Sequence, residues 1–285
     1  MQDPAVTDWQ TLSLPNTWPD NLTLSRPQDL RLFLRHALGM TRSPVQLPPD
    51  TPFADRIPKY ILQEFHNLPN GNYSQRFTRG YITGFNRVML GEIHRSHQRI
   101  VQQLWQDPAV QQGAVLDVGC GGGGLAGCLY QAGIPDVWGL DPSPYLLKHA
   151  ATDWPGVRFV QGVAEATGFD DHRFHAITAC FLLHELPPRY LDRCFAEFSR
   201  LLKPGGWLAF CEPSPVQLQT PLFQLCLQHG WRGVYFHYLA RFVYEPFLNA
   251  WHRQDIPTLL SQHGFTLMQH DMGMPMRHVL ARKHA

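Results

Sequence analysis

The sequence predicts an α/β fold built on a mostly parallel sheet with helices on both faces. Two observations lead to this prediction. Between residues 114 and 212, strand-like apolar runs alternate with helical runs, which is the pattern of a parallel sheet. The first run, Ala114–Val118, passes directly into a glycine-rich turn, and the second ends in a lone acid, Asp141. A strand, a glycine turn and a strand ending in a carboxylate predict a ligand site at the edge of that sheet.

The segment before the sheet reads as a helical cap. Residues 1–26 are polar, rich in proline and without a period, which predicts an extended arm pinned by Trp9 and Trp18. The remaining pattern predicts a helix over 30–38 ending at Gly39, a five-proline loop over 43–58, a short helix over 60–65, a turn over 67–74 and one helix over 77–104. We therefore expect residues 1–105 to form an N-terminal arm and helical cap, and residues 106–285 the ligand-binding domain.

Residues 216–251 interrupt the alternation of strands and helices and predict a helical insertion. The stretch from Tyr235 to Trp251 is aromatic on nearly every helical face, and a helix apolar all round is usually buried between two surfaces. Pro246 should end or kink it. We expect this insertion to cover a substrate pocket together with residues 70–85. A packing helix or a dimer interface is the alternative, which leaves a homodimer open.

Composition narrows the classes of function. The formal net charge is +1 and charged residues make up 16% of the chain, so no basic surface for nucleic acid is expected. No signal peptide is visible, and no run reaches the roughly 20 apolar residues of a membrane span. The six cysteines lack paired spacing, which favours a reduced, cytoplasmic protein. The histidines, such as His94 and His97, carry no metal-binding motif, so no metal site is predicted.

The glycine turn is compatible with two cofactors. Gly119, Gly121 and Gly124 fit the dinucleotide pattern G-x-G-x-x-G, which alone is a weak signal. Asp117, two residues earlier, would repel a pyrophosphate but suits the ammonium and sulfonium of S-adenosylmethionine (SAM). Asp141 is placed to accept hydrogen bonds from both ribose hydroxyls. The residues therefore favour SAM.

The run D-x-G-x-G-x-G from Asp117 resembles motif I of the class I SAM-dependent methyltransferases, and residues 114–212 resemble the core of the UbiE-type members. The resemblance implies a Rossmann-like fold with a seven-stranded sheet. It implies strands at 115–118, 137–141, 157–161 and 174–183, a turn at 201–206 before strand five, and a closing antiparallel pair at 265–272 and 277–282.

The same resemblance implies a set of cofactor contacts. The family's adenine-binding aspartate is replaced by Val163, so adenine recognition falls on Ala164 and Glu165. Phe181 would form a wall of the cofactor pocket, and Tyr73 would close over the methionine end. The full set of expected cofactor-binding residues is Asp117, Gly119, Cys120, Gly121, Asp141, Pro142, Ala164, Glu165, Phe181 and Tyr73.

Methyl transfer from a sulfonium is an in-line displacement that needs alignment and the exclusion of water more than acid–base groups. His184, after strand four, is the candidate general base because its ordinary pKa suits work near neutrality. Glu185 is a second candidate. In the alternative interpretation, His184 only caps or packs. Glu212, at the end of strand five, faces the substrate or caps the insertion.

The sequence thus predicts a SAM-dependent methyltransferase acting on a small molecule with an apolar, aromatic or cationic part. The acceptor atom (oxygen, nitrogen, sulfur or carbon) is not indicated. A nicotinamide-dependent oxidoreductase is an alternative, against which Asp117 counts. A non-catalytic SAM-binding protein and a methyltransferase for protein or nucleic acid are others.

Overall fold

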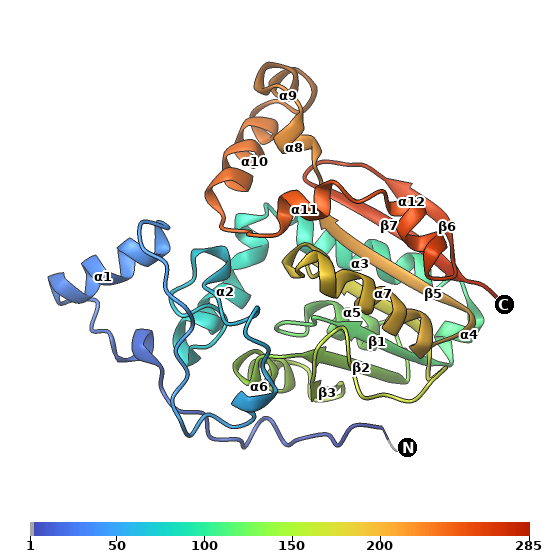
Figure 1. The fold of residues 1–285 in the computed structure, drawn as a ribbon, viewed down its shortest axis with the longest axis horizontal. Coiled ribbons are helices and arrows are strands. Elements are labelled where there is room, and N and C mark those ends of the chain that lie inside the picture. The colour runs from blue at the N-terminus through green and yellow to red at the C-terminus, as the bar shows by residue number, and fades with distance from the viewer. Residues whose placement is uncertain (1–2) are drawn as a thin grey trace.

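The computed structural model describes residues 3–285 and contains a seven-stranded sheet with the strand order β3-β2-β1-β4-β5-β7-β6 (Figure 1). The first five strands run parallel, and β7 lies antiparallel between β5 and β6. This confirms the predicted sheet, including its closing antiparallel pair. The strands are β1 Ala114–Val118, β2 Asp136–Asp141, β3 Arg158–Gln161, β4 Phe174–Cys180, β5 Leu202–Pro213, β6 Phe265–Asp271 and β7 Met276–Lys283.

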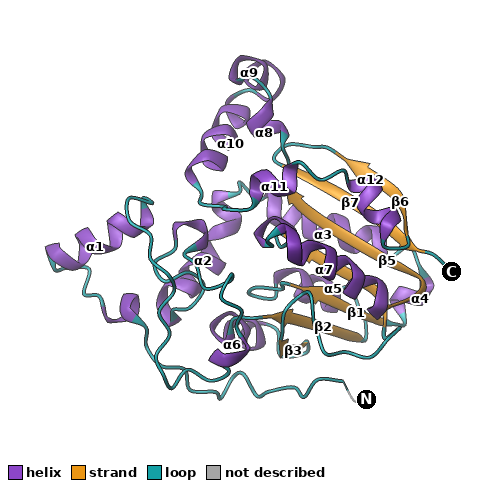
Figure 2. Cartoon of the chain, in the orientation of Figure 1, coloured by secondary structure: helices purple, strands orange, loops and turns teal. Residues whose placement is uncertain are grey.

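Helices cover both faces of the sheet, as predicted. The helices α7 (Pro188–Leu201) and α12 (Ile256–Gln262) lie on the near face in Figure 2, and α3 (Glu92–Leu104) and α5 (Gly124–Gln131) lie behind it. Alternate residues of β1 therefore enter different cores: Leu116 packs into the core of α7 and α12, and Val115 into the core of α3 and α5. The helices α4 (Pro108–Gln111) and α6 (Pro144–Asp153) complete this central layer.

The N-terminal segment starts with an extended arm that is pinned as predicted. The indole Nε1 of Trp9 donates a hydrogen bond of 2.8 Å to the carbonyl oxygen of Phe159 on β3, and Trp9 is buried. Trp18 begins the first 3-10 helix, and its ring lies against that of His36. The segment contains η1 Trp18–Asn21, α1 Pro27–Ala37, η2 Ala54–Arg56, η3 Phe65–Asn67 and α2 Gln75–Val88.

Several predicted boundaries in this segment are wrong. The short helix expected over 60–65 is absent. The chain forms turns there, and a 3-10 helix, η3, begins only at Phe65. The single helix expected over 77–104 is two helices, α2 and α3. The break falls at Leu90 and Gly91, whose φ angles are 52° and 81°. A left-handed backbone cannot continue a right-handed helix, and the apolar period resumes after the break.

Two predictions around the central strands also need correction. Strand four ends at Cys180 instead of residue 183, because residues 183–185 form the 3-10 helix η4 (Leu183–Glu185). The turn expected at 201–206 does not precede β5. It lies inside β5 as an irregularity, where the pairing with β4 jumps from Leu202 to Trp207.

The insertion after β5 is helical, as predicted, and projects away from the sheet beside α2 (Figure 1). It comprises α8 Val216–Gln219, α9 Leu222–His229, α10 Trp231–Phe242 and α11 Leu248–His252. The break expected at Pro246 is present, since α10 ends before it and α11 begins after it. In the described part of the chain, the helices are too short or too polar to cross a membrane.

Candidate active site

The glycine turn after β1 has the backbone that the sequence predicts. Gly119 and Gly121 have φ angles of 66° and 53°, which a side chain disfavours. A Cβ on Gly119 would lie 2.7 Å from a methyl group of Leu182, whereas a Cβ on Gly121 would meet nothing within 4 Å. Gly119 thus allows close packing against the loop after β4, and Gly121 leaves open space above the turn for a ligand.

Asp141 is fixed by the backbone on both of its carboxylate oxygens. Oδ2 accepts a hydrogen bond of 2.9 Å from the amide of Gly121, and Oδ1 accepts one of 2.9 Å from the amide of Ser143. Burial raises the pKa of Asp141 to about 7, even though these two amides favour the charged form. The carboxylate is therefore held in one orientation, and each oxygen keeps a lone pair for a further hydrogen bond.

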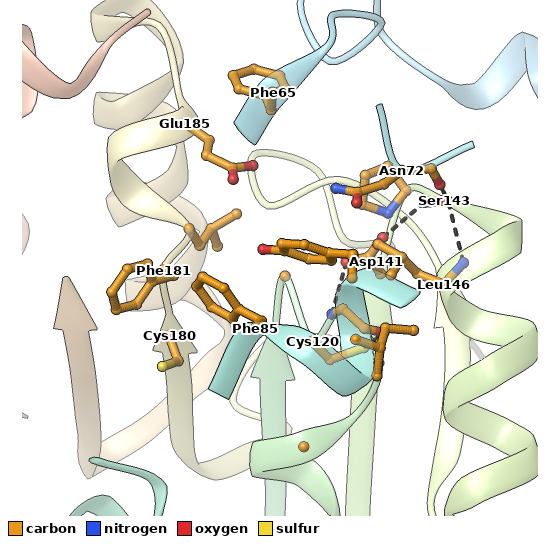
Figure 3. Close-up of a pocket in the computed structure, with 18 of the residues that line it drawn as sticks. Phe65, Asn72, Phe85, Cys120, Asp141, Ser143, Leu146, Cys180, Phe181 and Glu185 are labelled. Carbon is orange, nitrogen blue, oxygen red and sulfur yellow. Dashed lines mark hydrogen bonds between the residues drawn. The ribbon is translucent and has the colours of Figure 1, made fainter. Parts of the chain in front are cut away.

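A cavity of about 470 Å³ opens over this turn. Its volume is in the range of ligand pockets, roughly 300–1,000 Å³. Figure 3 shows Asp141 in the middle of the cavity, with Phe181, Cys180 and Glu185 on one side and Asn72, Ser143 and Leu146 on the other. The predicted cofactor residues that line it are Gly119, Cys120, Gly121, Asp141, Pro142, Ala164, Phe181 and Tyr73.

Two predicted cofactor residues lie outside this lining. Asp117 is buried beneath the turn, where it accepts hydrogen bonds from the amide of Ala126 (3.1 Å) and the hydroxyl of Thr178 (2.8 Å). Burial raises the pKa of Asp117 to about 7. Glu165 accepts both of its hydrogen bonds from the hydroxyl of Tyr60, at 2.8 and 2.9 Å. The structure therefore places Asp117 as an anchor of the turn and Glu165 as a partner of Tyr60.

Buried polar atoms without partners point to a ligand in the cavity. The hydroxyl of Tyr73 and the side-chain oxygen Oδ1 of Asn72 are buried and accept or donate no hydrogen bond. Both residues line the cavity. The backbone oxygen of Tyr73 accepts hydrogen bonds from Thr17 and Asn70, so its turn is anchored, not loose. Buried polar groups are normally paired, and a bound ligand would supply the missing partners.

A second cavity, of about 430 Å³, adjoins the first. Its lining comes mainly from apolar side chains of α2, α10 and the loop before α11, including Phe85, Phe236 and Leu239. Tyr238, by contrast, is 59% exposed and lies outside the lining. The residues that line both cavities are His66, Tyr81, Phe85 and Phe181.

Phe181 has a strained backbone at this shared wall. Its φ angle is 59°, which is rare for a bulky residue and costs of order 1–3 kcal/mol. Its amide donates a hydrogen bond to the carbonyl oxygen of Cys211, and its ring meets Phe85 edge-on, with 5.6 Å between centroids. This hydrogen bond and this ring contact maintain the strained backbone and keep the ring between the two cavities.

A buried group of histidines and glutamates lies behind this wall. The Nδ1 atom of His184 is 2.6 Å from Oε2 of Glu212, and its Nε2 atom is 3.1 Å from Oε2 of Glu245. The Nε2 atom of His66 is 3.1 Å from both Glu245 Oε1 and Glu185 Oε1. The predicted candidates His184 and Glu185 are thus brought together, but only Glu185 lines a cavity.

The charges of this group shift its pKa values. Burial disfavours a charge on His66, but Glu245 and Glu185 outweigh it and raise the pKa of His66 to about 10. Burial likewise opposes charge on His184, and Glu245 and Glu212 hold its pKa well above the usual range. Glu212 neither faces a substrate nor caps the insertion. It accepts hydrogen bonds from the amides of Leu182, Leu183 and His184 as well as the imidazole.

The sequence analysis missed His66, Asn72 and Glu245. His66 and Asn72 stand in an irregular segment before the sheet, and Glu245 in the loop between α10 and α11. The amide of His66 donates to the carbonyl oxygen of Tyr244, and Asn67 Nδ2 donates to that of Phe242. These contacts join segments about 180 residues apart, which no short spacing reveals. A local signal existed only in Glu245-Pro246, where a proline stops the aromatic helix.

Known proteins resemble this chain in both sequence and fold. The sequence pattern of a methyltransferase-domain family matches residues 115–206. An uncharacterized methyltransferase of Synechocystis is 31% identical over 200 residues, which cover 70% of this chain and 86% of that protein. A demethylmenaquinone methyltransferase of Chlorobaculum tepidum is 37% identical over 99 residues, covering 35% of this chain and 40% of its own length. The match to this second relative therefore spans less than half of it.

Solved structures show the same fold. Magnesium protoporphyrin IX methyltransferase from Synechocystis, solved with bound S-adenosylhomocysteine, aligns with a TM-score of 0.51 and 18% identity over 72% of this chain and 97% of its own. A methyltransferase from Haloferax volcanii, solved with its activator, aligns with a TM-score of 0.52 and 15% identity over 74% of this chain and 98% of its own. Taken with the long match to the Synechocystis relative, the glycine turn, the fixed Asp141 and the sheet order place this chain in the class I SAM-dependent methyltransferases, with relatives of the UbiE type.

Proposed function

We propose that this protein transfers the methyl group of SAM to a small apolar acceptor that binds in the second cavity. The observation that carries the proposal is the pair of adjoining cavities with one shared wall. One contains the glycine turn and Asp141, the features on which a SAM nucleoside would rest. The other is lined mainly by apolar and aromatic side chains, which suits an acceptor with an apolar body.

The arrangement supports in-line transfer. A donor in the first cavity and an acceptor in the second would meet at the wall formed by Phe85, Phe181 and Tyr81, where aromatic rings keep water from the reacting atoms. Glu185 is the carboxylate that lines the cofactor cavity next to this wall. A proton-accepting role for Glu185 or His184 stays a prediction.

The names of relatives agree with an apolar acceptor. One relative is named as a demethylmenaquinone methyltransferase, and a relative from Mycobacterium leprae as a phthiotriol/phenolphthiotriol dimycocerosates methyltransferase. The second is 33% identical over 127 residues, which cover 46% of its length. We extend to this chain only the class of acceptor, an apolar small molecule.

The proposal is tested in two steps. Calorimetric titration should detect binding of SAM and S-adenosylhomocysteine but no binding of NAD. S-adenosylhomocysteine release should then be measured with a panel of quinols, phenols and long-chain alcohols, with purely polar acceptors as controls. No binding of either SAM species to folded protein would reject the proposal. Binding without turnover on any acceptor would instead favour a non-catalytic SAM-binding protein.

A further inference from the structure

The buried group behind the shared wall has the arrangement of a metal site. His66 Nε2, His184 Nε2 and one carboxylate oxygen each from Glu185 and Glu245 lie within 4.8 Å of one another. They come from η3, from η4 and from the loop between α10 and α11. The side chains are nearly enclosed: His184 is 0% exposed, His66 8%, Glu245 9% and Glu185 23%.

The distances within the group match the spacing of ligands around one ion. The three nitrogen–oxygen distances in the group are each 3.1 Å, yet His66 Nε2, His184 Nε2 and Glu245 Oε2 make no aligned hydrogen bond. Imidazole nitrogens and carboxylate oxygens bind Zn²⁺ at about 2.0–2.2 Å, which separates neighbouring ligand atoms by roughly 3–3.5 Å. Atoms that approach this closely without an aligned hydrogen bond have the spacing of ligands around one ion.

Glu212 supplies the support that a metal-binding histidine needs. Its Oε2 atom lies 2.6 Å from His184 Nδ1, on the far side of the ring from the group. Glu212 is itself held by backbone amides of η4 and the residue before it. A carboxylate on Nδ1 places the ring proton there and turns the lone pair of Nε2 toward the ion, as in carboxylate–histidine–metal arrangements.

The charges leave room for a divalent cation. Glu185, Glu212 and Glu245 bring three negative charges into this region, and the guanidinium of Arg277, whose strand position pairs with Glu212, brings one positive charge. Metal ligands must be neutral imidazoles, so a bound ion would displace the protons of His66 and His184. One divalent ion carries the same charge as those two protons and would keep the buried group balanced.

We propose that His66, His184, Glu185 and Glu245 bind a divalent transition-metal ion, with Glu212 positioning His184. Two nitrogen and two oxygen ligands favour Zn²⁺ or a similar ion over Mg²⁺ or Ca²⁺, which prefer oxygen alone. His66 lines both cavities, Glu185 the cofactor cavity and Glu245 the apolar cavity. If the proposed function holds, the ion would lie at the boundary of the cofactor cavity and the acceptor cavity.

Metal binding is tested on the full chain without any acceptor. The protein is stripped with a chelator, reloaded with Zn²⁺ or Co²⁺ and desalted, and its metal content is measured by mass spectrometry. We expect one ion per chain, and a visible Co²⁺ absorption spectrum typical of low coordination by nitrogen and oxygen. His66→Ala and Glu245→Gln should each weaken Zn²⁺ affinity by more than about 100-fold, whereas Glu212→Gln should cost roughly 10–100-fold because it acts through His184.

His229→Ala is the matched control, since His229 is an exposed histidine on α9 and should leave the metal content unchanged. Circular dichroism checks that each variant folds, and Glu245→Gln keeps the shape of the side chain if His66→Ala does not fold. Folded wild-type protein that takes up no Zn²⁺ or Co²⁺, or equal uptake in wild type and Glu245→Gln, would overturn the proposal. SAM titrations on the same samples separate this outcome from a failure of the proposed function, since Asp141 and the glycine turn are not among the proposed metal ligands.

Discussion

At the scale of single residues, Asp141 connects the sequence most directly to the proposed cofactor. Removing its carboxylate would take away charge-assisted hydrogen bonds to ribose, each worth about 1.5–3 kcal/mol. Asp141→Ala should therefore weaken SAM affinity by roughly tenfold to a hundredfold. Calorimetry measures the loss, and circular dichroism should show an unchanged fold. SAM affinity equal to that of the wild type would show that Asp141 does not hold the ribose.

The raised pKa of Asp141 also predicts a pH dependence of binding. Its pKa is about 7 in the folded protein against 3.8 ordinarily, so the side chain takes up a proton as the pH falls through 7. A protonated carboxyl accepts hydrogen bonds less well, and SAM affinity should fall by up to about tenfold per pH unit below 7. In Asp141→Asn this slope should vanish. A slope that persists would assign the titration to a neighbour such as Asp117.

Tyr73 offers a test in which binding and stability respond differently. Its buried hydroxyl lacks a partner, so Tyr73→Phe removes an unpaired polar group and should leave the free energy of unfolding equal or higher. If SAM supplies the missing partner, its affinity should fall by roughly threefold to tenfold. Denaturant unfolding and SAM titration measure the two quantities. A loss of stability with unchanged affinity would contradict this role.

Site residues that are close together in the sequence could be predicted, whereas those that meet only in the folded protein could not. Gly119, Gly121 and Asp141 were predictable because the turn and the next strand end are local features with fixed spacing. Asp117 was placed in the cofactor site because its position in the motif is correct, but its side chain lies beneath the turn, where it accepts hydrogen bonds from Thr178 of β4 and the amide of Ala126. His66 and Glu245 meet only through tertiary contacts, and neither belongs to a motif.

At the scale of elements, periodicity identified most helices and strands but not their ends. The apolar face continues across the break between α2 and α3, so only the backbone angles of Leu90 and Gly91 reveal it. Similarly, the apolar run after β4 hides the change from strand to 3-10 helix at Leu183. Burial on both sides of that change makes strand and helix residues look alike.

Substitutions at Gly84 of helix α2 should change the free energy of unfolding and the space in the apolar cavity separately. Gly84 lies inside α2 and lines the apolar cavity, and a Cβ there would meet nothing within 4 Å. Because glycine in a helix interior costs about 1 kcal/mol relative to alanine, Gly84→Ala should raise the free energy of unfolding by about 0.5–1 kcal/mol. Gly84→Leu should instead fill the cavity and raise the KM for the acceptor.

The KM for the acceptor and the free energy of unfolding are measured for both variants. Gly84→Ala is the control, because it gains the helix preference of a non-glycine residue without filling the cavity. SAM affinity should not change in either, since Gly84 lies outside the cofactor cavity. An acceptor KM that is the same in Gly84→Leu and in the wild type would show that the acceptor binds elsewhere. Tyr238 is too exposed to serve as a test of the cavity lining.

At the scale of the whole molecule, the N-terminal arm is tied to the far edge of the sheet. Trp9 is 2% exposed, bonds to β3 and packs edge-on against Phe53, with 5.8 Å between ring centroids. Trp9→Ala should lower the free energy of unfolding by about 3–5 kcal/mol. Val6→Ala, in the same arm but 51% exposed, should change it little. Denaturant unfolding of both variants measures the difference, and equal stability would mean the arm is not part of the cooperative unit.

The shared wall between the cavities has a consequence for how such enzymes diversify. Apart from Phe181, the lining of the apolar cavity comes from residues 33–89 and 213–275, whereas the turn and acid of the cofactor cavity lie within the parallel sheet. Under the proposed function, new acceptor ranges could arise by exchanging the segment before the sheet and the insertion after β5, while the glycine turn and Asp141 stay unchanged. A chimera that carries both of these segments from a relative should adopt that relative's acceptor preference. A chimera that carries only one of them should lose the contact between the two segments, in which the amide of His66 donates to the carbonyl oxygen of Tyr244.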